Sequence, residues 1–229
     1  MSREKWNSFL QKFFGDKLES VLMGITMVIS VILALGIFMV LPFFLTNLMK
    51  GFLPSYSIRT LIEGIIRVAL FLIYIWLISK MEDIKRVFMY HGAEHKTINC
   101  LEHGENLTPE NIKKYSRLHK RCGTSFLLIV MIVSIVVFMF IRVDSLVWKF
   151  VLRILLVPVV AGISYEFIRL AGRSDSKIVN TLSKPGLYLQ YFTTREPDEE
   201  MMEVAIKAVE GVFDWREYLR AMHNGELED

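Results

Sequence analysis

The residues best suited to chemistry form a short run near the middle of the chain, Tyr90-His91-Gly92-Ala93-Glu94-His95. The spacing His-x-x-Glu-His is the inverted form of a zinc-enzyme motif. On a helix, His91 and His95 lie one turn apart on one face, and Glu94 stands beside them. Two such imidazoles can share a metal ion, while the carboxylate takes a proton from metal-bound water. The pattern therefore predicts a divalent-metal site, with zinc as the expected ion and Glu94 as the general base.

A third ligand must come from another part of the chain. His119 and Cys122 stand three residues apart, immediately before a long apolar run. Gly104 is expected to end the first helix, and Thr108 and Pro109 are typical of the N-cap and first position of a new one. Such a helical hairpin would bring His119 back toward the histidine pair. We therefore expect His119 to be the third metal ligand.

Three further residues are candidates for alternate ligands or for hydrogen-bonding support of the ligands: Cys122, Glu102 and Glu166. Glu102 falls on the same helix face as the two histidines if that helix continues. Glu166 lies inside an apolar run, where an ionisable residue is costly and indicates function. An ion pair with a nearby arginine is its structural alternative. Cys100 lies on the opposite side of the helix and is expected to be packed.

Long apolar runs must position this segment. Apolar residues make up 53% of the 229 residues and are grouped into four runs, at about 21–48, 61–79, 124–141 and 146–170. A bilayer-spanning helix needs about 20 such residues, and helices satisfy their own backbone groups in lipid. The sequence predicts an all-α, polytopic membrane protein with four transmembrane helices. The formal charge of +3 is too small for a nucleic-acid-binding face, so no nucleic acid is expected as a partner.

The distribution of basic residues predicts the orientation. Of the 27 Lys and Arg residues, 21 fall in residues 1–20, in residues 80–123 and from residue 169 onward. Such residues concentrate on the cytoplasmic side of a membrane. We therefore expect both termini to be cytoplasmic, with the chain in the inner (cell) membrane. Both cysteines then lie in or beside a reducing compartment, where a disulfide is not expected.

Three parts follow from these patterns. Residues 1–20 should form a cytoplasmic amphipathic helix, and residues 21–170 a four-span membrane domain with a cytoplasmic His/Glu-rich loop at 80–123. Residues 171–229 should form a cytoplasmic tail of amphipathic helices. The oligomeric state is not predicted.

Several other features are expected to be structural. In the tail, residues 183–186 predict a turn. Pro197, expected at the first helical position and followed by three acids, predicts the start of a helix. The apolar stripe of this helix, within 202–213, should pack against the rest of the protein. Glu63 and Arg67, inside the second apolar run, are spaced to form an ion pair one helical turn apart.

Four long stretches carry a family resemblance: MEDIKRVFMYHGAEHKTINC, ENLTPENIKKYSRLHKRCGTSFLLIV, ILLVPVVAGISYEFIRLAGR and PGLYLQYFTTREPDEEMMEVAI. They resemble the bacterial DUF1385 family of YqhQ-like membrane proteins from about residue 61 to residue 208. The family is described as metal-dependent enzymes, but this description rests on a His/Glu pattern like that of His91, Glu94 and His95. The resemblance therefore adds no independent support for an activity. Longer relatives carry a Gly-Gly-Gln-Ala-Val-type segment ahead of the first span. The resemblance therefore implies that this chain is a short form or is completed by another chain.

Two functions remain open at this point. The first is a metal-dependent hydrolase with a cytoplasm-facing site of the HxxEH type, acting at the membrane surface on a lipid-linked or membrane-protein substrate. The second is a non-catalytic factor that binds or assembles other membrane proteins, in which the His/Glu cluster is structural. Convergence of the ring nitrogens would favour the first, and capping of those nitrogens by carbonyls or carboxylates would favour the second. A transporter is a weaker third hypothesis, because four spans offer little room for a pathway.

Overall fold

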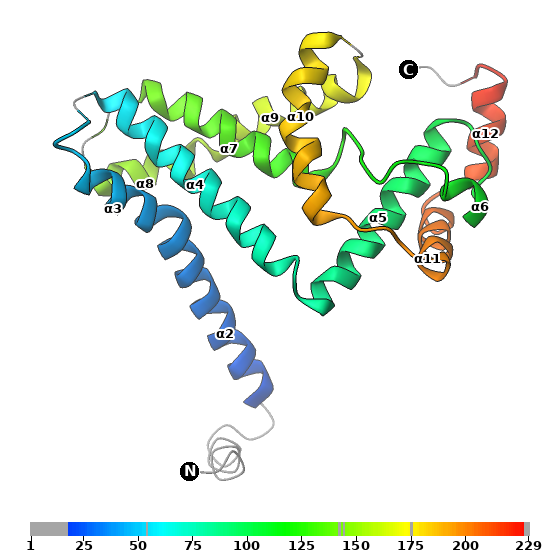
Figure 1. Ribbon diagram of the computed structural model, residues 1–229, viewed down its shortest axis with the longest axis horizontal. Helices are drawn as coiled ribbons and strands as arrows, with labels where there is room; N and C mark the ends of the chain where they lie inside the picture. The colour runs from blue at the N-terminus through cyan, green and yellow to red at the C-terminus, as the bar shows by residue number, and fades with distance from the viewer. Residues whose placement is uncertain (1–17, 54, 142, 144, 175, 227–229) are drawn as a thin grey trace. The chain divides into compact units, whose positions relative to one another are not determined.

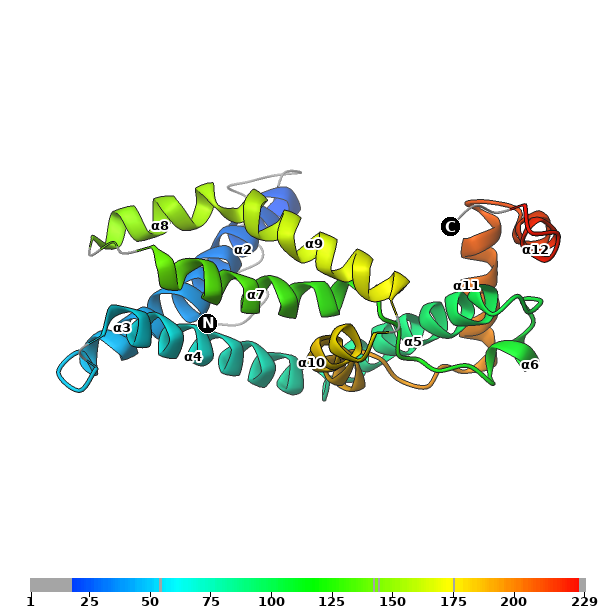
Figure 2. The ribbon, with the colours of Figure 1, turned by 90° about the horizontal axis from the view of Figure 1, so that it is seen from above.

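The computed structural model describes residues 18–226, apart from residues 54, 142, 144 and 175. Within that part of the chain all regular structure is helical and no strand occurs, which confirms the all-α prediction (Figures 1 and 2). The amphipathic helix expected over residues 1–20 lies almost entirely outside the described residues. The chain divides into two compact units, residues 1–70 and 71–229, and each is described by itself.

The first unit is built from one long apolar helical segment and the beginning of a second. Its elements are α2 (Leu18–Leu35), a π-helical turn η2 (Gly36–Val40), α3 (Leu41–Leu48) and the first part of α4 (Tyr56–Ile78). The segment Glu19–Leu48 is continuous in spite of the change in helical winding.

Pro42 gives a physical reason for the π-helical turn. A proline has no N–H for the carbonyl four residues earlier, here that of Phe38, and its ring crowds that carbonyl. The Phe38 oxygen instead accepts a hydrogen bond from Nε of Arg67 at 3.0 Å. Arg67 also pairs with Glu63 at 3.1 Å, which confirms the predicted ion pair. The two charged residues thus satisfy each other and a backbone carbonyl inside an apolar segment.

Three of the four expected spans are single helical segments long and apolar enough to cross a membrane: Glu19–Leu48, Tyr56–Ile78 and α7 (Gly123–Phe140). The fourth is broken into α8 (Leu146–Leu155) and α9 (Val157–Arg173), which meet at a 44° bend. Pro158 lies at the second position of α9, and a proline removes a helical donor and disfavours helical backbone in the residue before it. The structure therefore has three candidate spans, or four if the bent pair is one span.

The second unit adds five helices that do not resemble spans. They are α5 (Glu82–Glu102), α6 (Pro109–Ile112), α10 (Lys177–Thr193), α11 (Glu199–Glu210) and α12 (Trp215–His223). Helix α6 begins where the sequence predicted a helix, because Thr108 Oγ1 accepts a hydrogen bond from the N–H of Asn111 at 3.3 Å. Gly104, which follows α5, has a φ of +76°, a conformation that favours glycine.

A small core joins α5, α6, α11 and α12. Its fully or nearly buried members are Ala93, Cys100, Leu101, Leu107, Ile112, Met201, Met202, Trp215 and Leu219. Cys100 has no exposed surface, as expected for a packed thiol. Ala205, Ile206 and Val209 pack against this core, so the α11 stripe has the predicted packing role. Contrary to expectation, Pro197 is not the first helical residue but precedes the N-cap Asp198, and the helix begins at Glu199.

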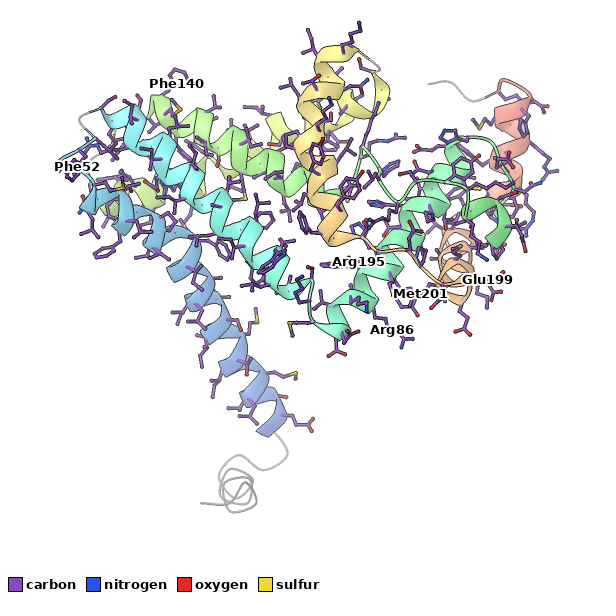
Figure 3. The ribbon with its side chains drawn as sticks, in the orientation of Figure 1. Phe52, Arg86, Phe140, Arg195, Glu199 and Met201 are labelled. Atoms are coloured by element: carbon purple, nitrogen blue, oxygen red, sulfur yellow. The ribbon has the colours of Figure 1, made fainter. Side chains whose placement is uncertain are left out.

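Helix α10 runs through the segment where a turn was expected, so that prediction is wrong. Pro185 lies inside the helix. Gly186 packs so closely on α7 that a Cβ there would lie 2.8 Å from Cβ of Ser125, and Gln190 donates a hydrogen bond to the same serine at 2.6 Å. Packing on α7 thus outweighs the local preference for a turn. Figures 1 and 2 show α10 crossing one end of α7, and Figure 3 places Phe140 at the other end.

Candidate metal centre

Three ligand-type side chains converge where α5 meets the start of α7. His91 and His95 come from α5, Cys122 is the N-cap of α7, and one ligand atom from each lies within 4.8 Å of the others. Cys122 Sγ is 3.4 Å from His91 Nε2, and the two imidazole centroids are 4.3 Å apart. Around a tetrahedral zinc ion, with bonds of about 2.0–2.3 Å, neighbouring donor atoms lie about 3.3–3.6 Å apart. The cluster therefore already approaches the spacing of a zinc site.

Backbone carbonyls orient both imidazoles. His91 Nδ1 lies 2.8 Å from the oxygen of Thr193, and His95 Nδ1 lies 2.7 Å from the oxygen of Arg117. A carbonyl oxygen can only accept, so each Nδ1 is the donor, and in a neutral ring the lone pair is on Nε2. Metal-binding histidines usually donate their other ring N–H to such a group. The capping expected of a structural cluster is therefore present at one nitrogen of each ring, and it leaves the other nitrogen, Nε2, able to bind a metal.

Gly92, in the middle of the motif, allows the chain after α10 to reach α5. The N–H of Arg195 donates to the oxygen of Phe88 at 2.8 Å, and Figure 3 shows Arg195 beside α5. A Cβ on Gly92 would overlap the carbonyl oxygen of Arg195. This close approach places the oxygen of Thr193, two residues earlier, against His91. A glycine is therefore required for the orientation of the first candidate ligand.

The surroundings of Cys122 favour its thiolate. Burial opposes ionisation, but the hydrogen bonds between Cys122 and His91, His95 and Thr124 outweigh it and lower the pKa of the Cys122 thiol to about 5. The thiol also stands at the N-terminus of α7, where negative charge is favoured. Burial lowers the pKa of His91, yet its bonds to Cys122 and Thr193 leave it raised overall. At neutral pH the cysteine is therefore in the form that binds metals.

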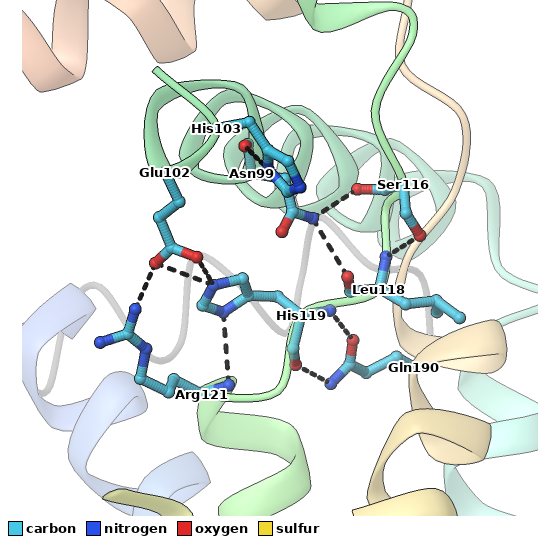
Figure 4. A network of polar contacts seen from close by, with 8 residues as sticks. All are labelled: Asn99, Glu102, His103, Ser116, Leu118, His119, Arg121 and Gln190. Atoms are coloured by element: carbon cyan, nitrogen blue, oxygen red, sulfur yellow. Dashed lines mark hydrogen bonds and ion pairs between the residues drawn. The ribbon is translucent and has the colours of Figure 1, made fainter. Parts of the chain in front are cut away.

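His119, expected as the third ligand, does not belong to this group of three. Its ring centroid is 5.8 Å from that of His95. Its Nε2 lies 3.2 Å from a carboxylate oxygen of Glu102, and its Nδ1 accepts the N–H of Arg121 at 3.3 Å (Figure 4). The main chain of His119 is also fixed, because Gln190 both accepts its N–H and donates to its carbonyl. Both ring nitrogens thus have partners within the protein.

Glu102 lies on the expected face of α5 but acts on His119 rather than on the cluster. The hydrogen bond from His119 lowers the pKa of the Glu102 carboxyl, and the charge and hydrogen bond of Arg121 lower it further, against the effect of burial. Arg121 forms an ion pair with the same carboxylate. Glu102 therefore contacts His119 and Arg121, and it is not one of the three residues of the cluster.

The two remaining candidates are exposed. Glu94 borders an apolar pocket of about 690 Å³ between α5 and the helices α11 and α12, and neither His91 nor His95 lines this pocket. Glu166 lies on α9 and pairs with Arg169 at 3.5 Å, its structural alternative, and is not part of the cluster. The sequence did not identify the carbonyls of Thr193 and Arg117, because no residue type marks a backbone oxygen as a partner. It also did not identify the side-chain amide of Gln190, which lies 71 positions from His119 in the sequence.

The fold and the site together define a class: a protein whose described residues form helices without strands, three or four of these helices being apolar enough to span a membrane, with a His/His/Cys cluster at the end of one of them. The chain belongs to the DUF1385 family of proteins of unknown function, whose model matches residues 2–215. It is 41% identical over 182 residues to the uncharacterized protein YqhQ of Bacillus subtilis (strain 168).

That alignment covers 79% of this chain and 57% of YqhQ, so the chain spans little more than half the length of this curated relative. No solved structure matches. The family resemblance is thereby confirmed, while neither name states an activity.

Proposed function

We propose that this membrane protein binds a divalent metal ion, zinc, through His91, His95 and Cys122, and that it is a hydrolase acting at the membrane surface. The observation that carries the proposal is the convergence of three donors whose two imidazoles are oriented by backbone carbonyls. Nitrogen and thiolate donors suit zinc. Three protein ligands leave a fourth position for water, which zinc activates in hydrolytic sites.

The roles of the neighbouring acids follow from their positions. Glu94 lies on the same helix, one residue before His95, and its exposed carboxylate is the proposed general base. Glu102 acts indirectly, by holding His119 and Arg121 beside the centre. The apolar pocket that Glu94 borders is suited to the apolar part of a substrate.

The location of the cluster supports a substrate at the membrane. Cys122 caps a candidate span, and α10, which crosses that end, exposes Ile178, Leu182 and Phe192. Exposed apolar residues on a helix at this level are typical of the membrane interface. A lipid-linked or membrane-protein substrate is therefore proposed. The distribution of Lys and Arg supports a cytoplasm-facing site in the inner membrane, with both termini cytoplasmic.

Elemental analysis of the detergent-purified protein tests the metal. The wild type should hold about one zinc per chain, and Cys122→Ala and His91→Ala should hold less than about 0.2. His119→Ala should retain the wild-type content, because His119 is held by Glu102 instead. Cys100→Ala is the matched control for loss of a thiol. A wild type below about 0.2 metal per chain, unchanged by His91→Ala, would end the proposal.

A second function, a non-catalytic factor that binds or assembles other membrane proteins, is favoured by a different observation. Both ring nitrogens of His119 have hydrogen-bond partners within the protein, as in a structural network. Val204 of α11 and Val212, two residues after its end, are exposed and border the apolar pocket. A photo-crosslinker at Val212 in native membranes distinguishes the two functions. Discrete adducts with membrane proteins, in a chain that lacks metal, would support the factor.

A further inference from the structure

We propose that a second, polar pocket beside the candidate centre binds the phosphate of an anionic membrane phospholipid. This pocket has a volume of about 520 Å³ and lies between the end of α5 and the loop before α7, with Gly172 of α9 and Leu187 of α10 completing its wall. It contains none of the three candidate metal ligands. The proposal therefore goes beyond the hydrolase and does not require a metal.

Among the described residues that line this pocket, basic side chains outnumber acidic ones. Lys120 and Arg121 are permanent cations, two imidazoles (His103 and His119) stand with them, and Glu102 is the single carboxylate among the lining residues. Arg121 donates to Glu102 with one terminal nitrogen, while its side chain remains 48% exposed. A guanidinium has five N–H donors in a planar fork that matches phosphate oxygens. An anion is therefore the ligand that this lining favours.

The basic residues stand on a rigid base, which distinguishes the pocket from a mobile charged surface. Gln190 bonds to both the N–H and the carbonyl of His119 and also to Ser125 of α7. Arg121 passes directly over Gly172, where a Cβ would lie 2.5 Å from its Cδ. Glu102 holds the other end of the same side chain (Figure 4). The pocket is thus organised before a ligand arrives, which reduces the entropy cost of binding.

The position of the pocket selects a lipid rather than free phosphate. Its lining includes Gly172, near the end of α9, and Arg121, two residues before α7, and both helices are part of candidate spans. The last turn of α9 carries Arg173, and α10 begins with Lys177 beside the exposed Ile178. Basic and apolar side chains next to a span match the headgroup region of a membrane that contains anionic lipid.

Lipid binding by the full chain in detergent tests this proposal. The probes are dioleoyl-phosphatidylglycerol and zwitterionic dioleoyl-phosphatidylcholine, with retention measured by native mass spectrometry. The wild type should retain the anionic lipid about tenfold more strongly. The double variant Lys120→Gln/Arg121→Gln should lose this preference. Lys207→Gln/Arg216→Gln removes the same charge from α11 and α12 and should keep the preference.

Should the first double variant fail to fold, Lys120→Gln alone should still weaken retention about threefold. Equal losses in both double variants would mean that overall charge, not the pocket, attracts the lipid. Displacement of the lipid by millimolar inorganic phosphate would assign the pocket to free phosphate. Absence of any preference in the wild type would also overturn the proposal.

Discussion

Substitution of Gly92 by alanine tests how the candidate centre is built. In a helix interior, Gly→Ala alone is stabilising by about 1 kcal/mol. At Gly92 the new methyl group would overlap the carbonyl oxygen of Arg195. The segment must then move away from α5, which breaks the bond from Arg195 to Phe88 and the bond from His91 to Thr193.

The magnitude follows from these changes. Two hydrogen bonds contribute about 1 kcal/mol each, and overpacking costs about 1–3 kcal/mol. After the gain in helix propensity is subtracted, Gly92→Ala should be destabilising by about 2–4 kcal/mol. Loss of the oriented His91 should also weaken zinc binding about 10–100-fold.

Gly162→Ala is the matched control, because Gly162 lies inside α9 and a Cβ there would meet no atom within 4 Å. It should keep its metal affinity and be slightly more stable than the wild type. The assays are denaturant unfolding in detergent, followed by circular dichroism, and competition with a zinc chelator. If Gly92→Ala proves as stable as Gly162→Ala and binds zinc equally well, the account of the close approach is wrong.

Three further predictions follow from the same structure. In the metal-free protein the Cys122 thiolate should appear with a midpoint near its pKa of about 5, as an ultraviolet absorbance that Cys122→Ser abolishes. The stabilising effect of this thiolate should be complete above the pKa of the unfolded thiol and be lost as pH falls toward the folded value. Glu102→Gln should be destabilising by about 1 kcal/mol at neutral pH, and this effect should fade in acid as the wild-type carboxyl, whose pKa is lowered, becomes protonated. The control Glu166→Gln, in an exposed ion pair, should change stability by less than about 0.5 kcal/mol. Ser55→Cys should react with a membrane-impermeant thiol reagent in intact cells and Ser174→Cys should not; the reverse pattern would refute the orientation.

Local spacing was enough to predict much of the architecture. Apolar runs long enough to span a bilayer identify three candidate spans, because length and polarity alone decide whether a helix suits lipid. The Thr108-Pro109 pair identifies the start of α6, because capping involves only neighbouring residues. The relation between His91 and His95 follows from the pitch of one helix. The bend in the fourth span, beside Pro158, was not predicted, because the apolar run continues through it without a change in composition.

The choice of the third donor depended on tertiary structure. From the sequence, His119 was expected as the third ligand and Cys122 only as an alternate, but both precede α7 on a loop whose path is set by distant residues. Gln190 fixes His119, 71 positions earlier, and turns it toward Glu102. Thr193 reaches His91 across 102 positions.

The sequence by itself therefore determined three apolar spans, the start of α6 and the helix face that two imidazoles share, because these properties depend on neighbours within a few residues. Only the packing of α10 and its extension against α7 and α5 decided that Cys122, rather than His119, faces the pair. The packing of α10 on α7 also explains why a helix, rather than the predicted turn, forms at Pro185. The physical reason is the same in both cases: contacts between distant segments outweigh local preferences where side chains are buried.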